Sequence, residues 1–229
     1  MLLQTGKRKI GNKMGQAKHF DPEERLDRAV NAFWKNGFDG LSIQQLCKAM
    51  GLFPGSVYGT YGDKRQLFIK AIDRYIMTYS AEAVEILGQD TSGLTALQNY
   101  FDRLIDGMID GKRRWGCLIT NSIVELAQHE PTIRAKIDVH LLRLETAFAG
   151  AIARARQAGE IPGNTPLDSA AFLVCVVQGL NVLAKTKPSR QKLELIVSNA
   201  LSSLALQAEP FSREPELLPT NAERKRSSQ

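Results

Sequence analysis

Residues 42–67 bring together side chains that can donate and accept hydrogen bonds and form ion pairs. The hydroxyls and the amine that stand out are Ser42, Ser56, Tyr58, Thr60, Tyr61 and Lys64. Such groups suit phosphate oxygens and base edges, which are bound without any covalent bond being made or broken. Whether they act together depends on the elements that carry them.

Two short helical patterns meet within this stretch. Ser42 and Gln45 form a capping box that opens the first helix, and Gly51 suits the positive φ of the turn that follows. Pro54 fits the first turn of a second helix, which runs to about Tyr61. A short polar helix joined by a turn to a supporting helix is typical of a helix-turn-helix DNA reader.

The same stretch resembles the DNA-binding domain of the tetracycline-repressor-like (TetR/AcrR) family of transcriptional regulators. The matching residues are Ser42, Leu46-Cys47, Gly51-Leu52, Gly55-Ser56-Val57-Tyr58, Thr60-Tyr61 and Gly62-Asp63-Lys64-Arg65-Gln66-Leu67. The chain departs from the family at Phe53, where a capping Ser or Thr is common, and at Gly59, where a larger polar residue is common. The resemblance implies a homodimeric repressor that binds a palindromic operator in double-stranded DNA and is released by a small-molecule effector.

The resemblance also implies roles for residues of the reader. We expect Tyr58, Thr60, Tyr61 and Lys64 to contact phosphates, which position the protein on the duplex. The residues expected to face base edges in the major groove are Ser56, Pro54 and Gly55. Ser42 is assigned to the same DNA-binding set.

Positive charge is concentrated near the N-terminus. Residues 1–65 carry 11 Lys and Arg against 6 Asp and Glu, whereas the remaining residues carry 19 against 18. This asymmetry favours contact with a polyanion at one end of the molecule. Residues 1–19 contain five of these cations and no acid, which predicts a flexible basic arm that can order along DNA.

Helical periodicity continues through the rest of the chain without an alternating strand pattern, which predicts an all-α fold of about nine helices. The expected helices cover residues 21–36, 42–50, 54–61, 63–87, 92–111, 116–129, 131–158, 167–185 and 189–207. We expect four parts: the arm (1–19), an N-terminal three-helix helix-turn-helix domain (20–66), an effector-binding and dimerisation domain (67–207), and a disordered tail (208–229).

The segment from Ala170 to Val177 is apolar on all sides, so more than one of its faces must be buried. The resemblance implies that the last two helices of each subunit form a four-helix bundle in a twofold dimer. Burial within its own body is the alternative. The expected interface residues are Val174, Val177, Gln178, Asn181, Leu193, Val197 and Leu201.

Signatures of catalysis are absent from the sequence. It contains no Gly-x-Ser-x-Gly, His-Glu-x-x-His, Gly-x-x-x-x-Gly-Lys-Ser/Thr or Cys-x-x-Cys pattern, and its three histidines lie far apart. The sequence therefore predicts no enzyme, metal site or cofactor. The apolar run of eight residues is too short to span a membrane, so no membrane partner is expected.

An effector pocket is expected where aromatic and polar groups mix in the body. The candidates are Phe101, Ile105, Met108, Trp115, Cys117, Asn121 and His140, and ordinary core packing is the alternative for each. The three cysteines are best interpreted as free thiols in a reducing cytoplasm. Because Cys117 follows three cations and lies near a helix N-terminus, a thiol-based redox or electrophile sensor is an alternative function.

Overall fold

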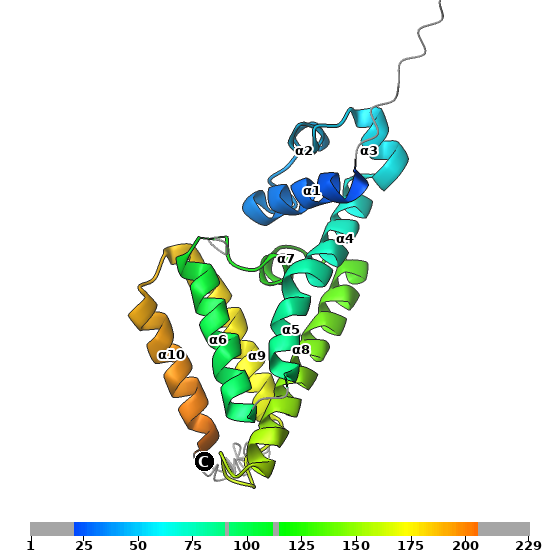
Figure 1. Cartoon of the computed structure of the whole chain (residues 1–229). Helices are drawn as coiled ribbons and strands as arrows, with labels where there is room; N and C mark the ends of the chain where they lie inside the picture. The colour runs from blue at the N-terminus through cyan, green and yellow to red at the C-terminus, as the bar shows by residue number, and fades with distance from the viewer. Residues whose placement is uncertain (1–20, 90–91, 112–114, 206–229) are drawn as a thin grey trace, which may run out of the picture.

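The computed structural model describes residues 21–89, 92–111 and 115–205, and within them it contains ten α-helices and no strand. The all-α prediction is therefore confirmed. The predicted basic arm and tail lie outside the described residues. Figure 1 shows a small head, formed by the first three helices, that is joined by α4 to a larger helical body.

The head contains α1 (Pro22–Asn36), α2 (Ile43–Met50) and α3 (Pro54–Tyr61), and α4 (Lys64–Tyr75) leaves it. The expected capping box of α2 is present, and α4 begins with a second one. The N–H of Gln45 donates to Oγ of Ser42 at 3.2 Å while Oε1 of Gln45 accepts from the Ser42 N–H at 2.7 Å. Asp63 and Gln66 cap α4 in the same reciprocal way.

The expected unbroken helix over 63–87 is wrong in one respect. Between α4 and α5 (Ala81–Gly88) the chain forms a π-helical turn, η1, from Ile76 to Ser80. The backbone stays helical but its hydrogen bonds span one more residue, which is a feature often found at functional sites. The helix therefore continues from α4 of the head into α5 of the body through a π-helical turn.

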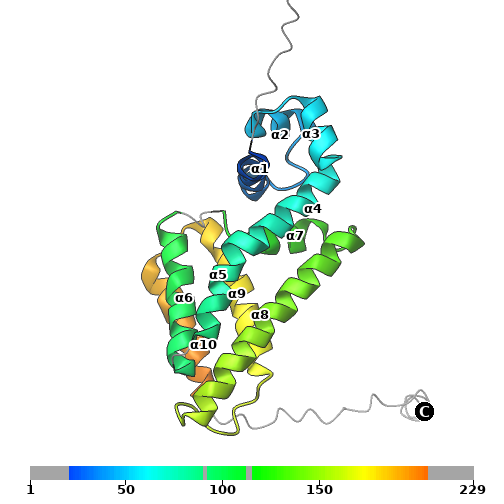
Figure 2. The same ribbon diagram turned by 45° about the vertical axis from the view of Figure 1, so that its right-hand side comes forward.

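The body contains α6 (Gly93–Ile109), α7 (Leu118–Leu126), α8 (Pro131–Gln157), α9 (Ser169–Leu183) and α10 (Arg190–Ser202), with short 3-10 turns η2 (Ala184–Thr186) and η3 (Ser203–Ala205). The long α8 packs against α5, α6 and α9, and α10 covers α6 and α9. Figure 2 shows α8 crossing the body beside α5. The predicted helix over 116–129 is shorter in the structure, where it forms α7.

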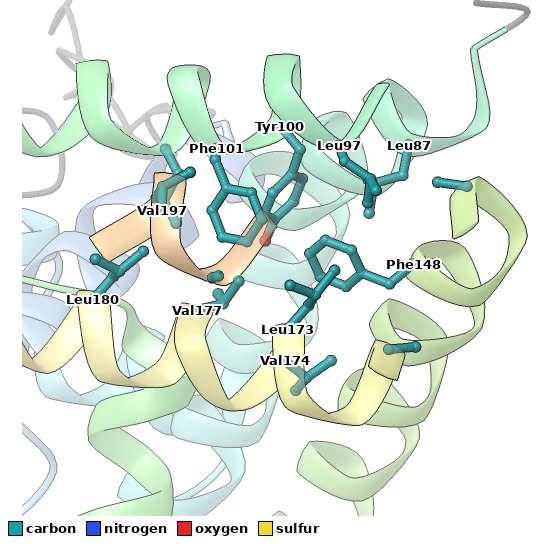
Figure 3. Packing of buried hydrophobic residues seen from close by; sticks show 14 of the residues in the cluster. Leu87, Leu97, Tyr100, Phe101, Phe148, Leu173, Val174, Val177, Leu180 and Val197 are labelled. Atoms are coloured by element: carbon teal, nitrogen blue, oxygen red, sulfur yellow. The ribbon is translucent and has the colours of Figure 1, made fainter. Parts of the chain in front are cut away.

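Two hydrophobic cores support this arrangement. The body core joins residues of α6, α8, α9 and α10, with Phe101 and Phe148 at its centre (Figure 3). The head core contains Phe33 and Phe68 and continues into Leu118 and Ile133 of the body. The head therefore shares its core with α7 and the start of α8.

One stretch of the described residues, Ser169–Thr186, is long and apolar enough by length and composition to cross a membrane, with a mean hydropathy of 1.5. Counting uninterrupted apolar residues overlooked it because polar residues punctuate the stretch. Here it forms α9 and η2, which pack against α7, α8 and α10 in the body. A single helix of this length and composition is weak evidence for a membrane span, and 39% of this one is buried inside the protein.

Candidate functional site

The turn between α2 and α3 fixes the position of the short helix. Gly51 ends α2 in the left-handed conformation, with φ of 65° and ψ of 36°. The next N–H, that of Leu52, donates to the carbonyl oxygen of Cys47 at 3.0 Å. Val57 is fully buried in the head core and holds α3 against α2. The opposite face of α3 is thereby turned toward solvent.

The exposed face of α3 carries most of the predicted DNA contacts. Pro54, Gly55, Tyr58 and Thr60 are exposed, and Ser56 is half-buried. Ser42 is also exposed, although its hydroxyl already accepts the hydrogen bond that caps α2. These residues therefore lie on the surface of the head, as a DNA contact requires.

Tyr61 does not fit its predicted role as a phosphate contact. Its side chain is only 4% exposed, and its hydroxyl donates to the carbonyl oxygen of Pro22 at 2.7 Å. Burial raises the pKa of this phenol, with a further rise from Asp21 that Arg25 opposes. The prediction is wrong because the ring fills the space between α1 and α3, so Tyr61 positions the reader.

Cations lie at the corner between α3 and α4. The ammonium of Lys64 is 4.2 Å from the centroid of the Phe38 ring, and its side chain is half-buried. The sequence analysis missed Lys70, whose Nζ donates to the carbonyl oxygen of Thr60 at 3.1 Å. No spacing signal marks Lys70, because this contact joins two different helices.

Specific contacts tie the head to the body. Nε1 of Trp34 donates to the carbonyl oxygen of Gly116 at 3.1 Å. The carboxylate of Glu125 in α7 accepts from the backbone N–H groups of Phe38 and Asp39, at 3.0 and 2.8 Å. An open cleft of about 580 Å³ lies beside these contacts.

A second, internal cavity lies in the body among η1, α5, α6, α7, α8 and α9. Its volume is about 30 Å³, and its walls are Ser80, Val84, Tyr100, Cys117, Ile119, His140, Leu144, Val177, Gln178 and Asn181. None of these wall residues is Asp, Glu, Lys or Arg. The cavity is therefore polar at some points but carries no permanently charged side chain.

Two buried polar atoms in this wall lack a hydrogen-bond partner within the described part of the chain, namely Nδ1 of His140 and Oδ1 of Asn181. The other amide atom, Nδ2 of Asn181, donates to the carbonyl oxygen of Val177 at 2.9 Å. Buried polar groups are normally paired, so each unpaired atom calls for a missing partner. Burial, helped by the charge of Arg143, lowers the pKa of His140 from 6.5 to about 4.

His140 also separates the cavity from the surface. On its other side lies an open groove of about 660 Å³ between α4, η1 and α8, bordered by Asp73, Ile76, Thr132, Ala135, Lys136, Val139, His140 and Arg143. The π-helical turn contributes Ile76 to the groove and Ser80 to the cavity. His140 and the π-helical turn η1 therefore contribute to the walls of both the cavity and the groove.

Comparisons with known proteins agree with this architecture. Residues 26–71 match the family described as bacterial regulatory proteins, tetR family, and residues 93–199 match the tetracyclin repressor-like C-terminal domain. The uncharacterized HTH-type transcriptional regulator YezE of Bacillus subtilis (strain 168) is 32% identical over 193 residues, which cover 83% of this chain and all of YezE. The chain belongs to the TetR family of transcriptional regulators.

Other TetR relatives include a repressor and a DNA complex. The repressor ComR of Escherichia coli (strain K12) is 26% identical over 189 residues, covering 82% of this chain and 90% of ComR. A cysteine mutant of the TetR regulator CifR, solved with 26-bp double-strand operator DNA, has a TM-score of 0.74 at 24% identity, over 82% of this chain and 99% of CifR. The reduced form of E. coli NemR has a TM-score of 0.68 at 20% identity. The match covers 83% of this chain and 98% of the NemR chain. At these identities the solved structures show the fold.

The candidate pocket residues of this TetR regulator do not form one site. Cys117 and His140 line the internal cavity, whereas Trp115 and Asn121 line the cleft beside the head. Phe101, Ile105 and Met108 are buried in the body core, so core packing accounts for them. The cavity residues that the pocket prediction missed include Tyr100, Gln178 and Asn181. The sequence signal for Gln178 and Asn181 was the presence of two amide side chains in the otherwise apolar helix α9.

The dimer residues expected from the TetR resemblance need a similar correction. Val174, Val177, Asn181, Leu193 and Val197 are buried by their own chain, and Figure 3 shows three of these valines within the body core. Gln178 and Leu201 are half-buried, and Gln178 accepts a hydrogen bond from Thr120 at 2.7 Å. The five buried side chains are wrong as interface residues, because they have little surface left for a partner.

The outer face of α9 is apolar as well. Phe172 is 46% exposed and Val182 is 49% exposed, and Cys175 and Gly179 lie exposed between them at helical spacing. A Cβ added at Gly179 would meet nothing within 4 Å, so the helix backbone is open to close approach. The described part of the chain leaves this second apolar face uncovered.

Proposed function

We propose that this TetR regulator is a cytoplasmic repressor that binds a palindromic operator as a homodimer and is released by a small uncharged molecule in the body. The observation that carries the proposal is the internal cavity, where His140 and Asn181 each present an unpaired buried polar atom. No partner for these atoms lies within the described residues, and we assign that role to a bound ligand. The same cavity wall lies next to the contact between the body and the DNA-binding head.

The wall chemistry defines the class of effector. A charged ligand would lose its hydration without meeting an opposite charge, because no acidic or permanently cationic side chain lines the cavity. Oδ1 of Asn181 needs a hydrogen-bond donor, and a neutral imidazole offers one donor and one acceptor. We therefore favour an uncharged molecule with at least one N–H or O–H group.

The cavity must widen to accept such a molecule. A volume of about 30 Å³ suits a water molecule or two. The wall that can move is the irregular one, where η1 contributes Ser80 and the start of α7 contributes Cys117. The effector would thus favour a conformation in which these two elements stand farther apart.

This widening would reach the head by two routes. Cys117 directly follows Gly116, whose carbonyl oxygen holds Trp34 of α1. The η1 turn directly follows α4, which is joined to α1 by the bidentate pair of Arg74 with Asp27 at 2.7 and 2.9 Å. Both routes would reorient the reading helices of the dimer relative to two half-sites, which lowers operator affinity.

The test begins with operator fragments selected from random DNA by the full-length protein. Uncharged alcohols, phenols and amides, and matching carboxylates and amines, are then screened for release of the fragment. We expect release by an uncharged donor. Asn181→Ala should abolish release while operator affinity is kept, and the control Asn121→Ala, in the other cleft, should leave release intact. Release only by charged compounds, or equal release from the Asn181 variant, would contradict the proposal.

The dimer contact is proposed at the outer face of α9. Phe172, Cys175, Gly179 and Val182 form a stripe that is both apolar and open to close packing. A second copy of the same helix would cover it in a self-complementary, twofold contact. We thus retain the predicted homodimer but place its interface on a different face of α9.

A thiol sensor remains the second candidate, because Cys117 lines the effector cavity and its Sγ accepts a hydrogen bond from the Tyr75 hydroxyl at 3.4 Å. Cys117→Ser should abolish release by peroxide or quinone if the thiol is the sensor, and should leave release by uncharged effectors unchanged. Cys47→Ser is the control, since burial raises the pKa of that thiol. Selective modification of Cys117 in mass spectra, coupled to loss of operator binding, would favour the sensor.

A further inference from the structure

The tip of the recognition helix carries an exposed aromatic ring. Phe53 is the N-cap residue of α3, and its side chain is 83% exposed although its neighbours Leu52 and Val57 pack toward the core. It makes no capping hydrogen bond. A polar residue at this position would cap the helix, so Phe53 gives up that local stabilisation. We therefore expect the Phe53 side chain to contact something other than the head.

The two residues that follow Phe53 cannot read a base by hydrogen bonds from their side chains. Pro54 and Gly55 follow it, and neither has a polar side chain. The nearby N–H groups of Ser56 and Val57 both donate to the carbonyl oxygen of Phe53, at 2.9 and 3.1 Å. The tip of α3 is consequently apolar in its side chains, and these two backbone donors are already engaged.

The outer face of α3 is also bare. Gly55 and Gly59 are four residues apart and share a helix face, and a Cβ added at either would meet nothing within 4 Å. Two glycines in an eight-residue helix cost about 1 kcal/mol each relative to alanine. What they provide is a helix backbone that can lie close to the floor of a DNA groove, which brings the ring of Phe53 within reach of the bases.

Residues at the N-terminal end of a recognition helix contact base edges in the major groove. The only apolar group among those edges is the 5-methyl group of thymine. We propose that Phe53 is a specificity-determining residue that packs on the methyl group of a thymine in each half-site of the operator. This assignment goes beyond the release mechanism and does not depend on it, since it concerns the head alone.

The expected size of the contact follows from burial of one methyl group. Covering a CH₂-sized group is worth about 0.8 kcal/mol, which corresponds to about fourfold in affinity for each half-site. A contact with sugar or phosphate instead of the methyl group would stabilise the complex without any preference for thymine. A methyl contact and a backbone contact therefore differ in whether the effects of a Phe53 substitution and of removing a thymine methyl on affinity are coupled or additive.

The experiment uses the full-length protein and its selected operator. Each thymine is replaced in turn by deoxyuridine, which keeps the base pair and removes only the methyl group. Wild-type protein should lose about fourfold in affinity per half-site at one position. Phe53→Ala should bind the thymine operator more weakly and should no longer distinguish thymine from deoxyuridine there. Phe53→Leu, which keeps an apolar side chain, should retain part of the discrimination.

Lys64→Ala is the matched control, because it should weaken binding to both operators and preserve their ratio. Thermal unfolding checks that each variant is folded, and the exposure of Phe53 predicts little change. The proposal fails if no thymine position shows coupling, that is, if Phe53→Ala and deoxyuridine reduce affinity additively everywhere, or if the alanine variant keeps the full discrimination.

Discussion

Trp34 of the head and Gly116 of the body are joined by a 3.1 Å hydrogen bond from the indole Nε1 to the carbonyl oxygen. Gly116 has a φ of +76°, and a Cβ at this position would lie 2.6 Å from the carbonyl oxygen of Asn181. Asn181 in turn lines the internal cavity. A single glycine therefore separates the cavity wall from the DNA-binding head, and no larger residue fits between them.

Trp34→Phe tests this connection. The variant keeps an aromatic ring but loses the N–H group, which leaves the buried carbonyl oxygen of Gly116 without this donor. We expect a loss of about 1–3 kcal/mol in the free energy of unfolding, nearly unchanged operator affinity, and weaker release by the effector. Urea unfolding and operator release measure these effects. Asn36→Ala, which removes a surface bond to Ala32 in the same helix, is the control. If the effector releases the operator from the Trp34 variant as it does from the wild type, the Trp34–Gly116 hydrogen bond does not couple the cavity to the head.

Lys64→Ala should weaken binding to every DNA sequence alike. Its ammonium lies beside Phe38 at the corner between α3 and α4, where phosphate contacts position a head. The slope of log affinity against log salt should fall by about one per subunit. Binding titrations at several salt concentrations measure it. Arg134→Ala on α8 should leave the slope unchanged. An altered base preference with the original slope would contradict this role for Lys64.

Stability should depend on pH through His140. Its pKa is lowered from 6.5 to about 4 in the folded protein, chiefly by burial. Between these values the unfolded chain binds a proton that the folded chain does not, so the free energy of unfolding falls as pH falls. The full effect is about 3 kcal/mol. Denaturation of wild type and His140→Gln from pH 7 to pH 4 should show this loss only in the wild type. Parallel pH curves would refute it.

Substitutions on the two faces of α9 should have different outcomes. Val182→Glu lies on the outer face and should give folded monomers, whereas Val177→Glu places a charge in the body core and should unfold the chain. Light scattering and circular dichroism distinguish the two. Oxidation should also cross-link wild-type subunits through the exposed Cys175 if the twofold axis passes near it. A wild-type monomer at micromolar concentration would exclude the dimer and its palindromic operator.

Local signals in the sequence predicted local structure well. The Ser42 capping box and the Gly51 turn depend on neighbouring residues, and both are present in the structure. The role of Tyr61 depended on which side of α3 faces α1, which its own hydroxyl could not reveal. The prediction of which α9 face forms the interface failed for a related reason. An all-round apolar pattern indicates that more than one face is covered, but not which of them is covered by the same chain.

The cavity was only partly predictable because its parts come from distant segments. His140 and Cys117 were candidates on chemical grounds, but Asn181 was assigned elsewhere because its helix resembled an interface helix. The π-helical turn η1 follows a regular apolar pattern in the sequence. No residue spacing in the sequence marks its wider hydrogen bonding.

An apolar helix tip cannot tell which base carries a methyl group. 5-Methylcytosine holds its methyl at the same place in the major groove as thymine does, so a ring that packs on one can pack on the other. With Phe53 at this tip, cytosine methylation inside the operator would change the affinity of the regulator while the base sequence stayed the same. Through the proposed Phe53 contact, chemical marking of DNA becomes a second input to operator binding.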